Sequence, residues 1–265
     1  MPPTTGSNPH ANARVLSCAP VLRAKDVVTL GNAACGLAAI LFCIQGRPVW
    51  AAYTIMVGYL FDVGDGLVAR ALGSSNRFGA ELDNLADHVT FGIAPAYCIY
   101  LAYRPTTPVL GIVLGAVYAL AATLRHTRNL VYDVPTSLCW VGMPRPVSAF
   151  IAVSFVHSRL FDTRFGPSLG VATVLGLAAT VLGTLPFVNH RGRRLQWWVR
   201  CIILGSAVSW IGSVLFLRAY FWDVVLFVSV GYSLISWMAL SREERRGFFE
   251  AVRAWKRTMA TGRAG

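Results

Sequence analysis

Four aspartates close together in the chain are the residues of this sequence most suited to chemistry. Asp62 and Asp65 are three positions apart and Asp83 and Asp87 are four apart, so each pair would lie on one face of a helix. If the two faces meet, the four carboxylates repel one another unless a cation neutralises them. Because hard divalent cations prefer oxygen ligands, the spacing predicts a site for Mg²⁺ or Mn²⁺ with all four aspartates as ligands.

Residues with small side chains accompany these aspartates. Gly66, Ala69 and Gly79 leave room for a bulky ligand against the backbone, and Arg70 offers a planar cation that suits phosphate oxygens. This combination indicates a nucleotide diphosphate that is held through metal ions. The alternative interpretation is that the charged residues cap helix ends or pair with basic loops.

The complete pattern over residues 62–87 is Asp-x-x-Asp-Gly-x-x-Ala-Arg, eight residues, and Gly-x-x-x-Asp-x-x-x-Asp. It resembles the signature of the CDP-alcohol phosphotransferase family. The resemblance implies an enzyme in which two divalent ions hold the diphosphate of a CDP-activated lipid. Asp62, Asp65 and Asp83 would bind the first ion. Asp87 would join the second ion and accept the proton of the incoming hydroxyl.

The same resemblance assigns a further set of residues to the CDP-lipid. Asn76 stands where small hydroxyl residues are usual, and it would donate a hydrogen bond to a phosphate or to cytosine. Asn32, a polar residue among apolar neighbours, either touches the nucleotide or acceptor or bonds to a neighbouring helix. The expected CDP-lipid residues are Asn32, Asp65, Gly66, Ala69, Arg70, Asn76 and Gly79.

Two more segments are similar to the phosphatidylserine synthase branch of that family. They read Leu-Arg-His-Thr-Arg-Asn at 124–129 and Gly-Met-Pro-Arg-Pro at 142–146. The resemblance implies CDP-diacylglycerol as donor and L-serine as acceptor. Arg125 and Arg128 are the candidates for the serine carboxylate, and anchoring of a membrane span is the alternative role. The chain departs from the branch at His126, where an apolar residue is more usual, and at Arg145, where a smaller one is common.

Other activities remain compatible with the sequence. The same reaction could use inositol phosphate, glycerol 3-phosphate or choline as acceptor, or an archaeal ether lipid as donor. The alternative outside enzymes is an ion-coupled transporter, because intramembrane carboxylates also line ion paths. The gathering of the aspartates beside small residues and Arg70 favours the enzyme. A homodimer is expected from the resemblance alone.

The composition indicates a membrane protein. Hydrophobic residues make up 55% of the 265 residues and charged residues only 14%. The net charge of +12 could suggest a nucleic-acid partner. However, the basic residues are spread over several loops between apolar segments and form no compact basic domain, so no nucleic-acid partner is expected.

Apolar segments separated by Pro, Gly or clustered charge predict an all-α, polytopic transmembrane bundle of about eight spans. The domain organisation is a mobile tail at 1–24, a transmembrane CDP-alcohol phosphotransferase domain at 25–240, and a basic tail at 241–265. This tail is expected either as an amphipathic helix on an anionic lipid surface or as a solvated charged helix. The expected spans are 27–45, 49–69, 79–103, 109–128, 147–161, 169–188, 199–217 and 221–240.

The distribution of basic residues predicts the orientation. With the amino terminus in the cytoplasm, 19 of the 24 Lys and Arg lie on the cytoplasmic side, as the positive-inside rule requires. Both termini and the aspartate site, at the ends of the second and third spans, then face the cytoplasm. We therefore expect an integral protein of the cell inner or plasma membrane whose site is reached by a soluble nucleotide and by membrane lipids.

Overall fold

The computed structural model describes residues 22–73, 77–131, 139–188, 218–238 and 240–260. Apart from loops and one short two-stranded sheet, these residues are helical. Proline at or near the first position begins α2, α4, α5, α6 and α7, and Gly73, with a φ of 56°, ends α2. In chain order the elements are α1 (Ala24–Ile44), α2 (Pro48–Leu72), α3 (Arg77–His88), the π-helical turn η1 (Val89–Ile93), α4 (Ala94–Tyr103), α5 (Pro108–Val131), β1 (Cys139–Val141), α6 (Arg145–His157), α7 (Gly166–Leu182), β2 (Pro186–Val188), the 3₁₀ turn η2 (Arg218–Tyr220), α9 (Phe221–Met238) and α10 (Arg242–Ala260).

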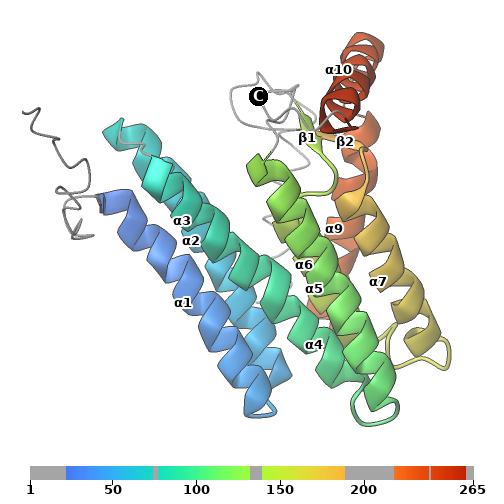
Figure 1. Cartoon of the computed structure of the whole chain (residues 1–265). Helices are drawn as coiled ribbons and strands as arrows, with labels where there is room; N and C mark the ends of the chain where they lie inside the picture. The colour runs from blue at the N-terminus through green and yellow to red at the C-terminus, as the bar shows by residue number, and fades with distance from the viewer. Residues whose placement is uncertain (1–21, 74–76, 132–138, 189–217, 239, 261–265) are drawn as a thin grey trace, which may run out of the picture.

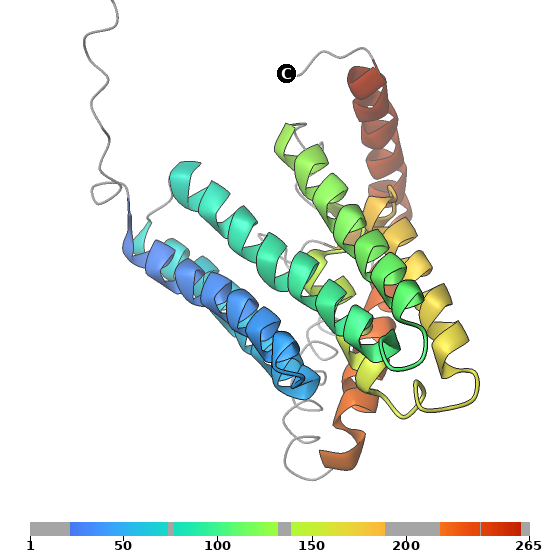
Figure 2. The same cartoon turned by 60° about the horizontal axis from the view of Figure 1, so that its bottom comes forward.

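The helices stand side by side in one bundle (Figure 1). α1 and α2 form an antiparallel pair, and α3, η1 and α4 continue one another as a single long rod. The rod lies between the α1–α2 pair and α5, which is also plain after rotation (Figure 2). The end of α2, the start of α3, the end of α5 and α10 all lie at the same end of the bundle.

Two buried clusters hold the bundle together. One joins α4, α5, α6 and α7 around Tyr103, Leu114 and Tyr118. The other joins α1, α2, η1, α4 and α6 around Ile55 and Phe91. Tyr118 also donates a hydrogen bond of 3.2 Å to the backbone oxygen of Phe91, inside the π-helical turn. Since a π turn displaces the regular helix bonds, this hydroxyl supplies a partner at the bulge.

The outer helix faces suit a lipid environment. α1 and α5 are long and apolar enough to cross a membrane, and α7 and most of α9 are shorter apolar helices. Large apolar side chains are exposed along them, including Leu41 on α1, Val109 on α5 and Phe227 on α9. Exposed apolar surface of this extent marks a membrane or protein contact. The helical, membrane-protein class expected from the sequence agrees with this structure.

The structure corrects two details of the expected spans. The segment expected at 169–188 ends as a helix at Leu182, because Gly183 is extended and Pro186 follows. Residues 186–188 instead form β2, which pairs antiparallel with β1 in a two-stranded sheet that the all-α prediction lacked. The span expected at 199–217 lies outside the described residues, so the number of spans stays a prediction.

The carboxyl-terminal tail forms a helix whose apolar side faces protein. Phe248, Val252 and Trp255 of α10 are buried and pack with Cys139, Val141, Val188 and Leu240, on and around the two-stranded sheet. Within Arg242–Ala260, one side of the helix is therefore apolar. This side is covered by the sheet, and the binding of lipid by the segment stays a prediction.

Candidate active site

Three of the four aspartates converge. Asp62 on α2 and Asp83 and Asp87 on α3 each offer a carboxylate oxygen, and these three atoms lie within 4.8 Å of one another. Asp62 and Asp83 are half-buried and Asp87 is buried. Carboxylates this close repel one another, and a divalent cation with a preference for oxygen relieves that repulsion. The donor set therefore fits a hard metal ion such as Mg²⁺ or Mn²⁺.

Asp65 lies outside this group of three. It is buried, and its Oδ2 atom accepts a 2.6 Å hydrogen bond from the Thr29 hydroxyl of α1. A carboxylate that is already hydrogen-bonded still has lone pairs for a further ligand. Its role as a metal ligand and as a CDP-lipid contact stays a prediction.

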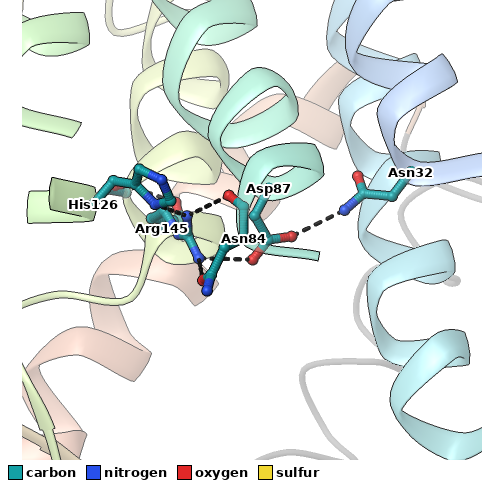
Figure 3. Close-up of polar contacts among 6 residues, drawn as sticks. Asn32, Asn84, Asp87, His126 and Arg145 are labelled. Atoms are coloured by element: carbon teal, nitrogen blue, oxygen red, sulfur yellow. Dashed lines mark hydrogen bonds and ion pairs between the residues drawn. The ribbon is translucent and has the colours of Figure 1, made fainter. Parts of the chain in front are cut away.

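Asp87 is held from two sides. Its Oδ1 atom accepts a 2.9 Å hydrogen bond from Nδ2 of Asn32 on α1, and its Oδ2 atom lies 3.3 Å from Nη2 of Arg145 on α6. Figure 3 shows the carboxylate between these two side chains. Asn32 is fully buried, and its backbone oxygen accepts a bond from Thr90 in the π-helical turn. The interhelical bond, one of the two roles expected for Asn32, is present in the structure.

The nucleotide side of the site is more open. Arg70 is exposed, and its guanidinium lies against Gly66, where a Cβ atom would be 3.4 Å from Nη1. Ala69 is half-buried and Gly79 is buried, at facing ends of α2 and α3. Asn76 lies outside the described residues. The roles of these residues in binding a CDP-lipid stay predictions.

Comparison with known proteins decides the family. The model of the CDP-alcohol phosphatidyltransferase family matches residues 24–185, which is more than half of the chain. The chain belongs to this family. The match includes the three converging aspartates, Asn32 and Arg145. The resemblance expected from the aspartate pattern is therefore confirmed.

Curated members of the family are similar to this chain over much of its length. A CDP-diacylglycerol--serine O-phosphatidyltransferase of Mycobacterium leprae is 33% identical over 171 residues, which cover 60% of this chain and 56% of that protein. One of Bacillus subtilis is 30% identical over 167 residues, which cover 62% of this chain and 89% of that protein. One of Helicobacter pylori is 26% identical over 221 residues, which cover 81% and 91%.

The two arginines expected to bind an acceptor have different surroundings in this family member. Arg125 is 5% exposed, and its buried Nε atom has no hydrogen-bond partner among the described residues. The charged groups that act on it are Arg145, Arg128 and Asp87. Arg128 instead donates to the backbone oxygens of Leu182 at 2.7 Å and Val141 at 3.3 Å. Arg125 thus has an unused Nε donor and interacts electrostatically with Asp87, whereas Arg128 ties α5 to α7 and β1.

Sequence reasoning missed several residues that shape this family member's site. The family pattern marks Arg145 only as a departure and does not indicate its contact with Asp87. The aspartate spacing gives no role to Thr29 and Thr90, although their hydroxyls bond to Asp65 and to the backbone of Asn32. Buried hydroxyl groups in an apolar helix need partners, so their positions between apolar residues were the available signal.

Proposed function

We propose that the chain transfers the phosphatidyl group of CDP-diacylglycerol to the hydroxyl of L-serine, forming phosphatidylserine and releasing CMP. The observation that carries this proposal is the convergence of Asp62, Asp83 and Asp87 within 4.8 Å. The family membership and the printed names of the relatives support the choice of substrates.

The acidic group would hold the cofactor of the reaction. We infer two divalent ions, Mg²⁺ or Mn²⁺, with Asp62, Asp83 and Asp87 as ligands and Asp65 completing the set. When bound, such ions neutralise the charge of a diphosphate and of the leaving group. Arg70 adds a further positive charge beside Gly66, where the exposed end of α2 suits an approaching nucleotide.

Asp87 would act as the proton acceptor. The serine oxygen forms a bond to the phosphorus nearest the lipid while the bond from that phosphorus to the CMP oxygen breaks. The hydroxyl proton passes to a carboxylate oxygen of Asp87, and CMP leaves with the bonding electrons. General-base catalysis of this kind contributes about 10²–10⁴-fold to the rate. The bond from Asn32 holds one oxygen of this carboxylate for the step.

Arg125 is the best candidate for the serine carboxylate. A buried guanidinium without a partner anion is costly, and an incoming carboxylate would supply that partner. Arg125 lies within the electrostatic reach of Asp87, so a small acceptor could contact both residues. Arg128 would help to hold this end of α5 in place through its bonds to the backbone oxygens of Leu182 and Val141.

The membrane arrangement is proposed from the sequence and the apolar helices. Transmembrane helices within 25–240 would place the aspartate end of the bundle, with both termini, at the cytoplasmic side. The excess of Lys and Arg at that side supports this orientation. A CDP-lipid would then enter from the bilayer and serine from the cytoplasm, and the enzyme would work as a homodimer.

The test is the release of CMP by the purified protein in detergent. CDP-diacylglycerol, Mg²⁺ or Mn²⁺ and a panel of acceptors (L-serine, inositol phosphate, glycerol 3-phosphate and choline) are supplied one at a time. We expect CMP release that depends on L-serine and on the metal. Release with a different acceptor would overturn the substrate, and metal-stimulated ion flux without CMP release would favour the transporter.

A further inference from the structure

Arg145 occupies a position in the site that the proposed mechanism leaves without a role of its own. It is the first residue of α6, and its side chain is only 13% exposed. Its guanidinium lies between α3 and α5, in contact with Asp87, Asn84 and His126 (Figure 3). No other described residue of α6 forms an ion pair with an aspartate of the site.

The orientation of this guanidinium does not depend on Asp87. Nη1 donates to the backbone oxygen of Asn84 at 3.0 Å, and Nη2 donates to the side-chain oxygen of Asn84 at 3.1 Å. Asn84 precedes Asp87 by one helical turn, so both lie on one face of α3. A two-point attachment of this kind exploits the planar fork of arginine, which a lysine lacks. The attachment would persist if Asp87 changed partner.

The two Nη atoms of Arg145 have further contacts. Nη1 lies 3.4 Å from Nδ1 of His126, whose ring stacks on His88 with centroids 5.3 Å apart. Each Nη atom carries two hydrogens, and with Nδ1 of His126 as an acceptor the contacts to Asn84, His126 and Asp87 account for all four. Arg145 therefore has no spare Nη donor for an acceptor carboxylate. This separates it from Arg125, whose Nε atom lacks a partner among the described residues.

We propose that Arg145 is a positioning residue, which fixes the Asp87 carboxylate in the orientation from which it accepts the hydroxyl proton. The inference rests on the proposed function, because it assigns Arg145 a role through Asp87. Asn32 binds Oδ1 and Arg145 binds Oδ2, so the carboxylate is fixed by one donor on each oxygen. Without Arg145, only the bond to Asn32 remains and the carboxylate turns about it.

A positioning role predicts a loss in kcat with little change in either KM. We expect Arg145→Gln to lower kcat by about 10–100-fold, the range of one charge-assisted hydrogen bond, while the KM values for serine and CDP-diacylglycerol stay within about threefold. Arg145→Lys keeps the charge but not the fork, so it should recover only part of the lost kcat. Asn84→Ala removes one anchor of the guanidinium and should lower kcat less than Arg145→Gln.

The experiment measures CMP release by these variants, together with CDP-lipid binding and thermal unfolding in detergent. Arg159→Gln is the matched control, since Arg159 follows the opposite end of α6 and its guanidinium lies 3.8 Å from the ring centre of Tyr220. It should keep wild-type kcat. If Arg145→Gln does not fold, Arg145→Lys and Asn84→Ala decide the question.

Each outcome discriminates between explanations. A raised serine KM with unchanged kcat in Arg145→Gln would overturn the inference in favour of direct acceptor contact. Full activity of Arg145→Lys would overturn it in favour of a role of charge alone, and unchanged kcat in all three variants would overturn it outright. A wild-type protein that releases no CMP with any acceptor would instead overturn the proposed function, and the positioning role with it.

Discussion

The two sides of the site are built from the chain in different ways. On the metal side, Asp62, Asp83 and Asp87 come from consecutive helices, and helical spacing places two of them on one face. On the acceptor side, Arg145 bonds to Asn84, which is 61 residues earlier, and Arg128 bonds to Leu182, which is 54 residues later. Local periodicity thus forms the first side, whereas the packing of distant segments forms the second.

α1 supports the metal side. Thr29 bonds to Asp65 on α2, and one turn later Asn32 bonds to Asp87 on α3. Polar side chains three apart on one face of an apolar helix therefore orient two carboxylates from different helices. The comparison predicts that substitutions on the metal side abolish most of the turnover, and that substitutions on the acceptor side cause smaller changes in kcat or in the KM for serine.

The largest effect is expected for Asp87→Asn. The amide cannot accept the hydroxyl proton, so kcat should fall by at least about 10²-fold, while most CDP-lipid binding should remain. Asp62→Asn, which alters a residue expected to bind metal only, is the matched variant and should weaken CDP-lipid binding more. Both are measured by CMP release and by CDP-lipid binding. Equal loss of binding in the two variants would contradict the separation of roles.

A smaller effect, confined to one substrate, is expected for Arg125→Gln. Removing the guanidinium expected to bind the serine carboxylate should raise the KM for serine by about 10–100-fold and leave the KM for CDP-diacylglycerol nearly unchanged. Arg128→Gln is the comparison, because Arg128 donates to backbone oxygens and should chiefly affect stability. Steady-state kinetics with each substrate varied in turn measure both. Equal changes in both KM values would remove Arg125 from the acceptor side.

The same contrast explains how much the sequence could predict. The aspartate spacing predicted the convergence because the period of a helix is fixed. It also included Asp65, yet the packing of α1 against α2 brings Thr29 to this carboxylate. Spacing indicates which residues share a face, and it does not indicate what that face meets.

Long-range pairing is the part that sequence reasoning could not supply. β1 and β2 are three residues each and lie far apart in the chain, so neither gives a periodic signal of its own. For this reason the apolar run that ends at Val188 resembles a helix in sequence.

The contact between His126 and Arg145 is also long-range, so the sequence does not reveal it. Both residues differ from those usual at these positions in the phosphatidylserine synthase branch. Their contact suggests that the two substitutions act together.

A stability effect that reaches the site is expected for Gly36→Ala. A Cβ atom at Gly36 would lie 2.9 Å from the backbone of Thr90, whose hydroxyl bonds to Asn32. The added methyl must push η1 away from α1, at a cost of about 1–3 kcal/mol in the free energy of unfolding. We expect a lower Tm in detergent and a reduced kcat, because Asn32 orients Asp87.

Gly176→Ala is the control for that substitution. Nothing lies within 4 Å of a Cβ atom at Gly176 in α7, so alanine should stabilise the helix by about 0.5–1 kcal/mol. A Tm that falls as much in Gly176→Ala as in Gly36→Ala would show that the loss does not come from the contact between α1 and η1.

The smallest effect on turnover is expected for Trp255→Leu on α10. Trp255 is buried against the β1–β2 sheet, and the guanidinium of Arg128 lies 5.4 Å from its ring centre. Leucine keeps an apolar side chain but is smaller than the indole, so the loss combines the cation–π contact with the cavity left in this cluster, about 2–4 kcal/mol in the free energy of unfolding. Tm should fall by about 5–10 °C, and kcat should remain near wild type. Since Arg128 also binds the backbone of Val141, a modest rise in serine KM would show that α10 supports the acceptor side through β1. A large fall in kcat would contradict the distinction between the two sides, because the apolar side of α10 packs on β1 and β2 whereas the three aspartates lie on α2 and α3.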